Sequence, residues 1–232
     1  MILTLAIGLT FVGSLLTALP ALVVELARRA SADVVFHAQT ARPVVALSID
    51  DGPSEATAEI LGVLAEHNVR ATFFVIGAHV EAEPELASAI VSAGHELGHH
   101  MMYDERSIGL PQDTFIQRFE QMDGKLRQLG GSRLFRPGSG WYDAEMVAAV
   151  ADRGYRTVLG SVYPFDAQLP FPRLASWYVL QQASPGAILV LHDGPERGIR
   201  TAEVLRRILP VLRRRGYDVV PVSELLDLAG RE

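Results

Sequence analysis

From Val44 onward, short apolar runs alternate with longer segments that have the periodicity of amphipathic helices. Strands that alternate with helices build a parallel sheet, which is either open or closed into a barrel. This alternation constrains the fold more than any other feature, and it predicts the α/β class. The expected strands cover residues 44–49, 71–76, 134–135, 156–161, 187–191 and 219–220, and the expected helices cover 57–67, 84–92, 113–129, 143–153, 173–182 and 201–215, with a last helix from 223.

The start of the chain is apolar: residues 1–24 carry no charged side chain. About 20 apolar residues span a bilayer as a helix, so the segment predicts a membrane-anchor helix over residues 1–25. The alternatives are a signal peptide, which would have a basic start and a shorter apolar stretch, and a buried core helix. Residues 26–43 are expected to be a linker, and residues 44–232 one catalytic domain.

The composition excludes several classes of protein. A formal net charge of −6 argues against a nucleic-acid-binding protein, which is normally basic. The absence of cysteine excludes a disulfide scaffold, a thiol nucleophile and a cysteine zinc cluster. Any metal in this chain is therefore held by oxygen and imidazole.

Two adjacent carboxylates, Asp50 and Asp51, come directly after the apolar strand 44–49, and Gly52-Pro53 breaks the chain after them. The carboxyl ends of strands are where α/β folds place their ligands. Neighbouring carboxylates repel each other, and one of them takes up a proton unless a cation neutralises the pair. The pattern predicts a cation at this position.

Three of the seven histidines, His95, His99 and His100, lie within six positions, and Asp104 follows them. Imidazole is the commonest protein ligand of zinc and similar metals. His100 and Asp104 are four residues apart, so they would share one face of a helix and one metal. The cluster predicts a metal site.

The same stretch contains the pattern His95-Glu96-x-x-His99, which is typical of zinc proteases. In those enzymes two histidines of one helix bind zinc and the glutamate acts as general base. Gly94 and Gly98 each disfavour a continuous helix here by about 1 kcal/mol. The glycines weaken the zinc-protease interpretation but do not exclude it, so a membrane-tethered zinc protease is an alternative.

Further polar residues follow later strands. Arg136 follows the expected strand 134–135, His192 follows 187–191, and Asp166 lies between them in the chain. Parallel strands present their carboxyl ends at one edge, where the two aspartates also lie. A base, an acid, a cation-binding cluster and an orienting arginine at one edge are typical of a metal-assisted hydrolase.

Four motifs in this order and approximate spacing resemble those of the polysaccharide deacetylase family (NodB-homology domain, carbohydrate esterase family 4). They are Asp-Asp-Gly-Pro, Gly-His-Glu-Leu-Gly-x-His, Arg-Pro-Gly and Leu-His-Asp. The resemblance covers about residues 44–228. It implies a distorted (β/α) barrel with a divalent metal at the strand carboxyl ends, Zn²⁺ first and Co²⁺, Mn²⁺ or Ni²⁺ as other options.

The resemblance also implies a role for each residue. Asp50 resembles the general base and His192 the general acid, while Arg136 orients the base and Asp166 tunes the acid. The implied metal ligands are Asp51, His100 and Asp104, the last standing where the family usually has a second histidine.

Two other positions depart from the family pattern. Ser139 or a neighbouring glycine stands where the family has a tyrosine, and backbone N–H groups there would serve the oxyanion. Ala167 stands where the family has a tryptophan that walls the acetyl pocket, and Trp141 is a candidate to replace that ring.

The implied reaction removes N-acetyl groups from an amino-sugar polymer or oligosaccharide that is chitin-like or peptidoglycan-like. A catalytically silent carbohydrate-binding relative is a second alternative, motivated by the departures. The expected partners are a carbohydrate and a membrane, reached through the N-terminal helix. Arg28 and Arg29 favour a cytoplasmic domain by the positive-inside rule, but the family's substrates favour an extracytoplasmic one, which is our expectation.

Overall fold

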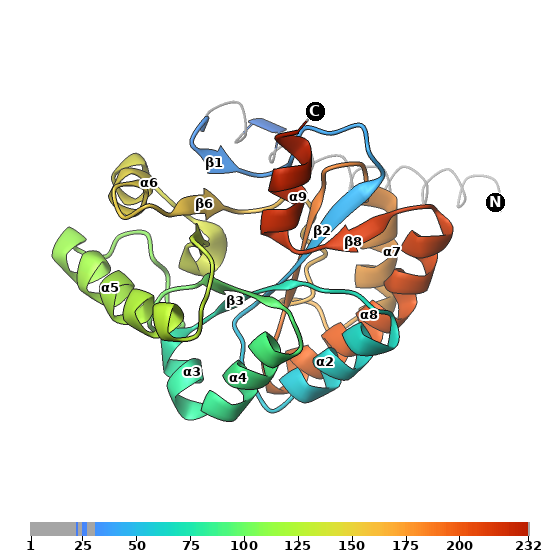
Figure 1. The fold of residues 1–232 in the computed structure, drawn as a ribbon, viewed down its shortest axis with the longest axis horizontal. Coiled ribbons are helices and arrows are strands. Elements are labelled where there is room, and N and C mark those ends of the chain that lie inside the picture. Colours follow the sequence, from blue (N-terminus) through green and yellow to red (C-terminus); the bar gives the residue numbers. More distant parts are fainter. Residues whose placement is uncertain (1–21, 23–24, 27–30, 232) are drawn as a thin grey trace, which may run out of the picture.

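The computed structural model describes residue 22, residues 25–26 and residues 31–231 (Figure 1). The predicted membrane-anchor helix over residues 1–25 falls almost wholly outside the described residues. Within the described part of the chain, no helix combines the length and the apolar character needed to cross a bilayer.

The described strands form an eight-stranded sheet in the order β1-β6-β5-β4-β3-β2-β7, with β8 paired to β2. Neighbouring strands are parallel, and the sheet curls until an isolated parallel bridge joins Val162, just after β6, to Leu189 in β7. The predicted α/β class and parallel sheet are confirmed, and the implied distorted (β/α) barrel is a curled half-barrel. The strands are β1 (Val34–Val35), β2 (Val44–Asp50), β3 (Thr72–Val75), β4 (Glu96–His99), β5 (Leu134–Phe135), β6 (Arg156–Val158), β7 (Ile188–His192) and β8 (Asp218–Val220).

Helices surround the curled sheet (Figure 1). Each lies in the connection between two parallel strands or follows the last one, because parallel strands need a crossover connection that is usually helical. They are α2 (Thr57–Glu66), α3 (Gly77–Ala82), α4 (Pro84–Ser92), α5 (Gln112–Gln128), α6 (Ala144–Ala151), α7 (Pro172–Gln182), α8 (Pro195–Arg214) and α9 (Val222–Ala229), with the 3₁₀ turn η1 (Gly138–Gly140).

Strand β2 is buried on both faces, and its alternate side chains enter two different cores. Val45, Leu47 and Ile49 pack in the large core between the sheet and the helices. Val44 and Ala46 point the other way, into a smaller cluster inside the curl. This is why β2 reads as a continuous apolar run instead of an alternating one.

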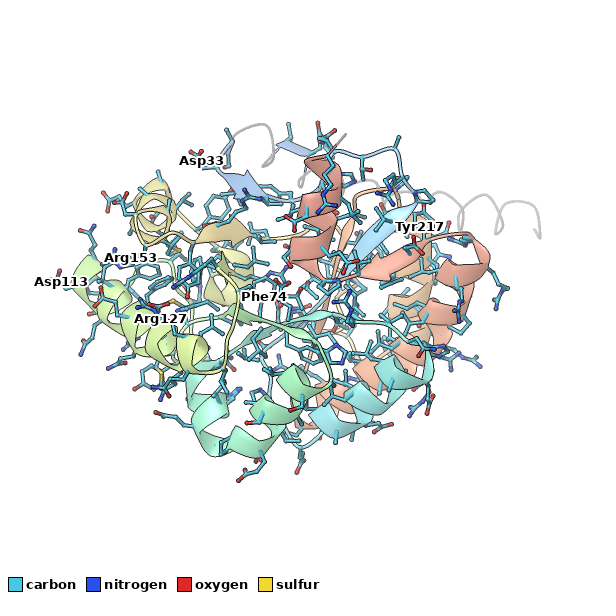
Figure 2. The ribbon with its side chains drawn as sticks, viewed as in Figure 1. Asp33, Phe74, Asp113, Arg127, Arg153 and Tyr217 are labelled. Atoms are coloured by element: carbon cyan, nitrogen blue, oxygen red, sulfur yellow. The ribbon has the colours of Figure 1, made fainter. Side chains whose placement is uncertain are left out.

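The inner cluster also contains Phe74 of β3, which lies within the curl of the sheet (Figure 2). Val222 and Leu225 of α9 pack into the same cluster, so this helix covers the inside of the sheet. Burying each such side chain contributes roughly 1.5–3 kcal/mol. With the interior filled by apolar groups, the polar residues collect at the edge.

Helix α8 is amphipathic as predicted, but it begins at Pro195, six residues before the expected start. Proline is favoured in the first helical turn because it has no N–H to leave unpaired. The earlier start brings residues 195–200 into the helix, including Arg197. Its buried residues include Leu205, Ile208, Leu209 and Leu212, as the pattern predicts.

Three expectations need correction. The predicted linker over 26–43 is not a linker throughout, because β1 pairs with β6 and Phe36 is buried. A strand, β4, occupies Glu96–His99, where the sequence predicts a metal cluster without a strand. Helix α3 was not predicted, because it is only six residues long.

Candidate active site

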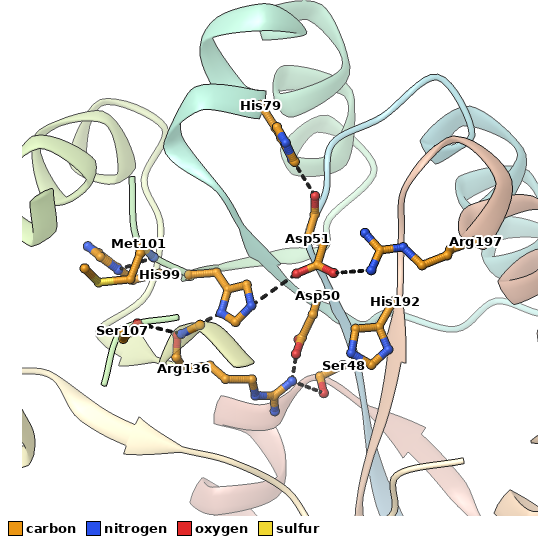
Figure 3. Close-up of polar contacts among 12 residues, drawn as sticks. Ser48, Asp50, Asp51, His79, His99, Met101, Ser107, Arg136, His192 and Arg197 are labelled. Carbon is orange, nitrogen blue, oxygen red and sulfur yellow. Dashed lines mark hydrogen bonds and ion pairs between the residues drawn. The ribbon is translucent and has the colours of Figure 1, made fainter. Parts of the chain in front are cut away.

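The strands bring most of the predicted polar residues to one edge of the sheet (Figure 3). Asp50 and His192 are register partners at the ends of β2 and β7. His100 directly follows β4, Arg136 directly follows β5, and Asp166 lies in the connection after β6. The prediction that these residues share one edge is correct.

Asp50 is held in a buried ion pair with Arg136. The Nη1 of Arg136 donates to Oδ1 of Asp50 at 2.5 Å and to the hydroxyl of Ser48 at 2.8 Å, while its Nε donates to the carbonyl of Val158 at 3.1 Å. Arg136 is 2% exposed, and its guanidinium lies over the ring of Phe74, 4.0 Å from the centroid. These contacts fix the orientation of the Asp50 carboxylate.

His192 is paired with Asp166. The backbone N–H of His192 donates to Oδ2 of Asp166 at 2.8 Å, and its Nδ1 lies 3.1 Å from Oδ1. Burial opposes the charged imidazole, but the hydrogen bond and charge of Asp166, together with the charges of Asp50 and Asp51, raise the pKa of His192 to about 9. The ring is therefore protonated at neutral pH, as a general acid must be.

Asp51 and His100 form a second buried pair. The Nδ1 of His100 donates to the carbonyl of Arg136 at 2.8 Å, which turns Nε2 toward Oδ1 of Asp51 at 3.2 Å. Burial opposes both charges, but the mutual attraction lowers the pKa of Asp51 and raises that of His100. Two electron-pair donors facing each other at this distance need a proton or a cation between them.

The donor pair of Asp51 and His100 suits a divalent ion. Donors 3.2 Å apart can both contact one ion at the usual ligand distances of about 2.0–2.2 Å. The Nδ1–H to carbonyl bond of His100 is the outer contact that metal-binding histidines usually make. These two residues fit a metal, and no third histidine or acidic ligand joins them among the residues that the structure describes.

The predicted third ligand, Asp104, is not part of this group. Residues 100–104 form no helix, because Met101 has a left-handed backbone (φ 70°), and Asp104 is exposed to solvent. Within the described residues, no three histidine or acidic side chains are placed to hold one metal ion together. The three-ligand set of Asp51, His100 and Asp104 is therefore not assembled.

The zinc-protease alternative is wrong. Its motif needs one helix, but Glu96–His99 is strand β4. His95 accepts a hydrogen bond from the backbone N–H of Ala71 at 3.1 Å, and Glu96 accepts one from the hydroxyl of Thr72 at 2.5 Å. These groups support the packing of β3 against β4 instead of forming a metal site.

His99 is a core residue. Its Nε2 donates to the carbonyl of Phe119 at 3.0 Å, its Nδ1 accepts from the N–H of Met101 at 3.1 Å, and its ring stacks on Phe119 with centroids 4.1 Å apart. Burial lowers its pKa to about 4. His99 is therefore neutral and fully paired on the helix side of the sheet, while the next residue, His100, reaches the site.

The loops at this edge contain unusual backbone. A left-handed conformation in a non-glycine residue costs of order 1–3 kcal/mol and persists where the surroundings enforce it. Four of the five such residues in the described chain lie in the loops that carry the site, which supports a functional edge. They are Asp51 (φ 69°), Met101 (φ 70°), Ser139 (φ 63°) and Phe165 (φ 60°).

Sequence reasoning missed two residues that contact Asp51. His79 of α3 donates from Nδ1 to the backbone carbonyl of Asp51 at 2.7 Å and so supports its left-handed backbone. Arg197 of α8 lies with Nη1 3.1 Å from Oδ2 of Asp51 (Figure 3). His79 belongs to no recognised motif. Arg197 could have been identified only by predicting that helix α8 begins at Pro195.

A third missed residue, Asp193, is fully buried behind the Asp50-Asp51 turn. It accepts from the hydroxyls of Ser54 at 2.7 Å and Thr57 at 2.5 Å, and its own N–H donates to the carbonyl of Asp50 at 2.8 Å. Asp193 therefore ties β7 and the start of α8 to the turn after β2. Its position directly after His192 in the sequence was the signal that could have identified it.

The two positions that depart from the family pattern lie in the loops that follow Arg136 and Asp166. The N–H of Gly138 donates to the hydroxyl of Ser107 at 2.7 Å, so it already has an acceptor. The N–H of Gly140 likewise donates to the carbonyl of Pro137 at 3.0 Å. Trp141 is 62% exposed. An oxyanion contact from the N–H of Ser139 and an acetyl-pocket wall formed by Trp141 both stay predictions.

Comparison with known proteins identifies the family. The model of the polysaccharide deacetylase family matches residues 37–158. A peptidoglycan-N-acetylglucosamine deacetylase from Bacillus cereus is 33% identical over 202 residues, which cover 83% of this chain and 92% of the relative. The chain belongs to the polysaccharide deacetylase family. A chitooligosaccharide deacetylase from Bradyrhizobium is also 33% identical, over 78% of this chain and 90% of the relative.

Solved structures agree with this assignment. A peptidoglycan N-acetylglucosamine deacetylase crystallised with an N-hydroxybenzamide compound superposes with a TM-score of 0.80 at 26% identity, covering 84% of this chain and 93% of that one. An acetyl xylan esterase of family 4 from Clostridium thermocellum, in complex with a cobalt ion, gives a TM-score of 0.74 at 28% identity over 81% and 92%.

The family also contains inactive members. A pseudoenzyme of carbohydrate esterase family 4 from Bacillus anthracis gives a TM-score of 0.77 at 27% identity, covering 83% of this chain and 68% of that one. Membership of the family therefore does not by itself make this chain an enzyme.

Proposed function

We propose that this chain is a metal-dependent hydrolase that removes N-acetyl groups from an amino-sugar polymer or oligosaccharide of the peptidoglycan or chitin type. The observation that carries the proposal is the facing pair of Asp50 and His192 in register on β2 and β7. One is a carboxylate held by Arg136, and the other is an imidazole kept protonated by Asp166. Amide hydrolysis needs one group of each kind.

Asp50 acts as the general base. Its Oδ1 is engaged by Arg136, so Oδ2 is the oxygen that takes a proton from the attacking water. Because Arg136 is buried and also donates to Ser48 and to the carbonyl of Val158, it holds the carboxylate in place beside the water. The water oxygen bonds to the acetyl carbonyl carbon, and Asp50 holds the proton that it loses.

His192 acts as the general acid. It gives its proton to the nitrogen of the sugar as the bond between carbon and nitrogen breaks, so that acetate and a free amine leave. Asp166 keeps Nδ1 engaged, which leaves Nε2 to deliver the proton.

Asp51 and His100 would hold the divalent ion, which we propose to be Zn²⁺, with Co²⁺, Mn²⁺ or Ni²⁺ as substitutes. When bound there, the ion would polarise the acetyl carbonyl and lower the pKa of a water molecule. The cobalt ion in the related acetyl xylan esterase supports a divalent metal in this family.

The test is acetate release from peptidoglycan and from chitin oligomers, by wild type with and without a chelator and by Asp50→Asn. We expect acetate from wild type, loss of release with chelator, and a loss of about 10²–10⁴-fold in Asp50→Asn. Arg206→Gln, a surface change on α8, is the matched control and should behave as wild type. Undiminished release by Asp50→Asn would contradict the proposal.

A catalytically silent carbohydrate-binding protein is the second candidate. The exposed position of Asp104 and the ion pair between Arg197 and Asp51 favour it, because both weaken a metal site. In that case the same oligosaccharides would bind in a calorimetric titration, but wild type would release no acetate with any of the four metals.

A further inference from the structure

Both side-chain oxygens of Asp51 already have a partner (Figure 3). His100 Nε2 lies 3.2 Å from Oδ1, and Arg197 Nη1 lies 3.1 Å from Oδ2. A guanidinium keeps its proton at every pH that a protein tolerates. A fixed positive charge therefore stands beside the carboxylate that the family uses for its metal.

Local packing places Arg197 there. It lies in the first turn of α8, and Gly198 brings that turn against the buried Asp193, since a Cβ at this glycine would lie 2.5 Å from Oδ1 of Asp193. Asp193 in turn bonds to the turn that carries Asp50. A Cβ at Gly194 would lie 3.1 Å from Nε of Arg197, so this glycine leaves room for the side chain. The arginine is 32% exposed and is directed to Asp51 by the helix.

Each of the two adjacent aspartates is thereby neutralised by its own arginine. Asp50 pairs with Arg136, and Asp51 pairs with Arg197. The cation expected from the repulsion between neighbouring carboxylates is therefore supplied twice by the chain itself. The two arginines cancel the negative charge of the two aspartates, so a divalent ion at Asp51 gains little attraction from them. To bind, the ion must also overcome repulsion from the Arg197 guanidinium or displace it.

We infer that Arg197 competes with divalent ions for Asp51 and weakens metal binding at this site. The inference rests on the proposed function only in taking Asp51 and His100 as the metal donors. It predicts a site that loads at higher metal concentration than its donors alone would require.

The experiment titrates the metal-free full chain with Co²⁺ by calorimetry and follows the visible absorption of bound cobalt. The variants are Arg197→Gln, Arg197→Lys and the control Arg206→Gln, which removes the same charge from the same helix far along its surface. Arg197→Gln should bind Co²⁺ about tenfold more tightly or better than wild type. Arg197→Lys, which keeps the charge, and Arg206→Gln should both stay within about threefold of wild type.

Equal or weaker cobalt binding by Arg197→Gln, with its thermal unfolding unchanged, would overturn the inference. If that variant fails to fold, Arg197→Met removes the same charge with a side chain of similar length and is read in the same way. Metal affinity is measured without substrate, so absent acetate release would count against the proposed function alone. Tighter cobalt binding would support the inference whether or not acetate is released.

Discussion

Asp50 and Asp51 are adjacent in the chain but belong to regions that are built differently. Asp50 is the last residue of β2, and its partners come from the interior of the sheet, where strand register holds them. Asp51 is the first residue of the turn, and its partners come from the end of β4 and from helix α8. The proposed acid–base half of the site is therefore fixed by the sheet, whereas the proposed metal half depends on loops and on the start of a helix.

The largest expected effect is on the acid–base half. His192→Ala removes the proton donor and should lower kcat about 10²–10⁴-fold with the fold intact. Wild-type activity should also fall as the pH rises through about 9, where His192 loses its proton. Acetate release by wild type and by His192→Ala, measured from pH 6 to 10, checks both statements. If the wild-type rate does not fall at alkaline pH, His192 is not the proton donor.

The next largest effect is a difference in the free energy of unfolding between variants of Arg136 and Arg197. Arg136→Gln leaves Asp50 as an unpaired buried charge and should lower the free energy of unfolding by about 3–5 kcal/mol. Arg197→Gln breaks a partly exposed pair and should cost about 1 kcal/mol or less. Urea unfolding measures the free energy of unfolding of both variants. Equal losses would contradict the difference between the two halves of the site.

Acid should destabilise the sheet through the buried, neutral His99. The pKa of His99 is about 4 in the folded state against 6.5 as the ordinary value, so the unfolded chain binds the proton first. Its contribution is complete above pH 6.5 and is lost as the pH falls from 6.5 toward 4, by up to about 3 kcal/mol. His99→Asn should be less stable at pH 7 and should lose less between pH 6.5 and 4.5 in urea unfolding. If the variant loses as much unfolding free energy over this pH range as wild type, a group other than His99 is responsible.

The smallest effect is expected at Asp104. Because this side chain is exposed and apart from Asp51 and His100, Asp104→Ala should leave cobalt affinity and thermal unfolding within error of wild type. Asp51→Asn is the reference that should abolish cobalt binding. A marked loss of affinity in Asp104→Ala would show that the loop closes onto the metal.

The residues predicted from strand ends were placed correctly, and those predicted from helical spacing were not. Asp50, Arg136 and His192 needed only the rule that parallel strands share one edge. His100 and Asp104 were paired by a helical repeat, but the chain there is a strand end followed by a left-handed residue. Strand β4 could not be recognised because its four residues include a glycine, a glutamate and a histidine. Period 2 then separates His99 from His100, which lie on opposite sides of the sheet.

Contacts that depend on tertiary packing had no signature in the chain. The approach of Arg197 to Asp51 depends on where α8 begins, and proline at its first position marks that start only weakly. His79 reaches Asp51 from a helix of six residues, which is shorter than periodicity can detect. β1 escaped detection because two valines make a strand only when β6 is beside them.

The pairing of β1 with β6 also has a mechanical meaning. The chain joins the sheet at Val34, and the bridge between His37 and Ala187 fastens it a second time. A pulling force applied before residue 31 would therefore load β6, which leads into the loop that carries Asp166. Tension at Val34 would therefore reach the loop whose Asp166 is paired with His192.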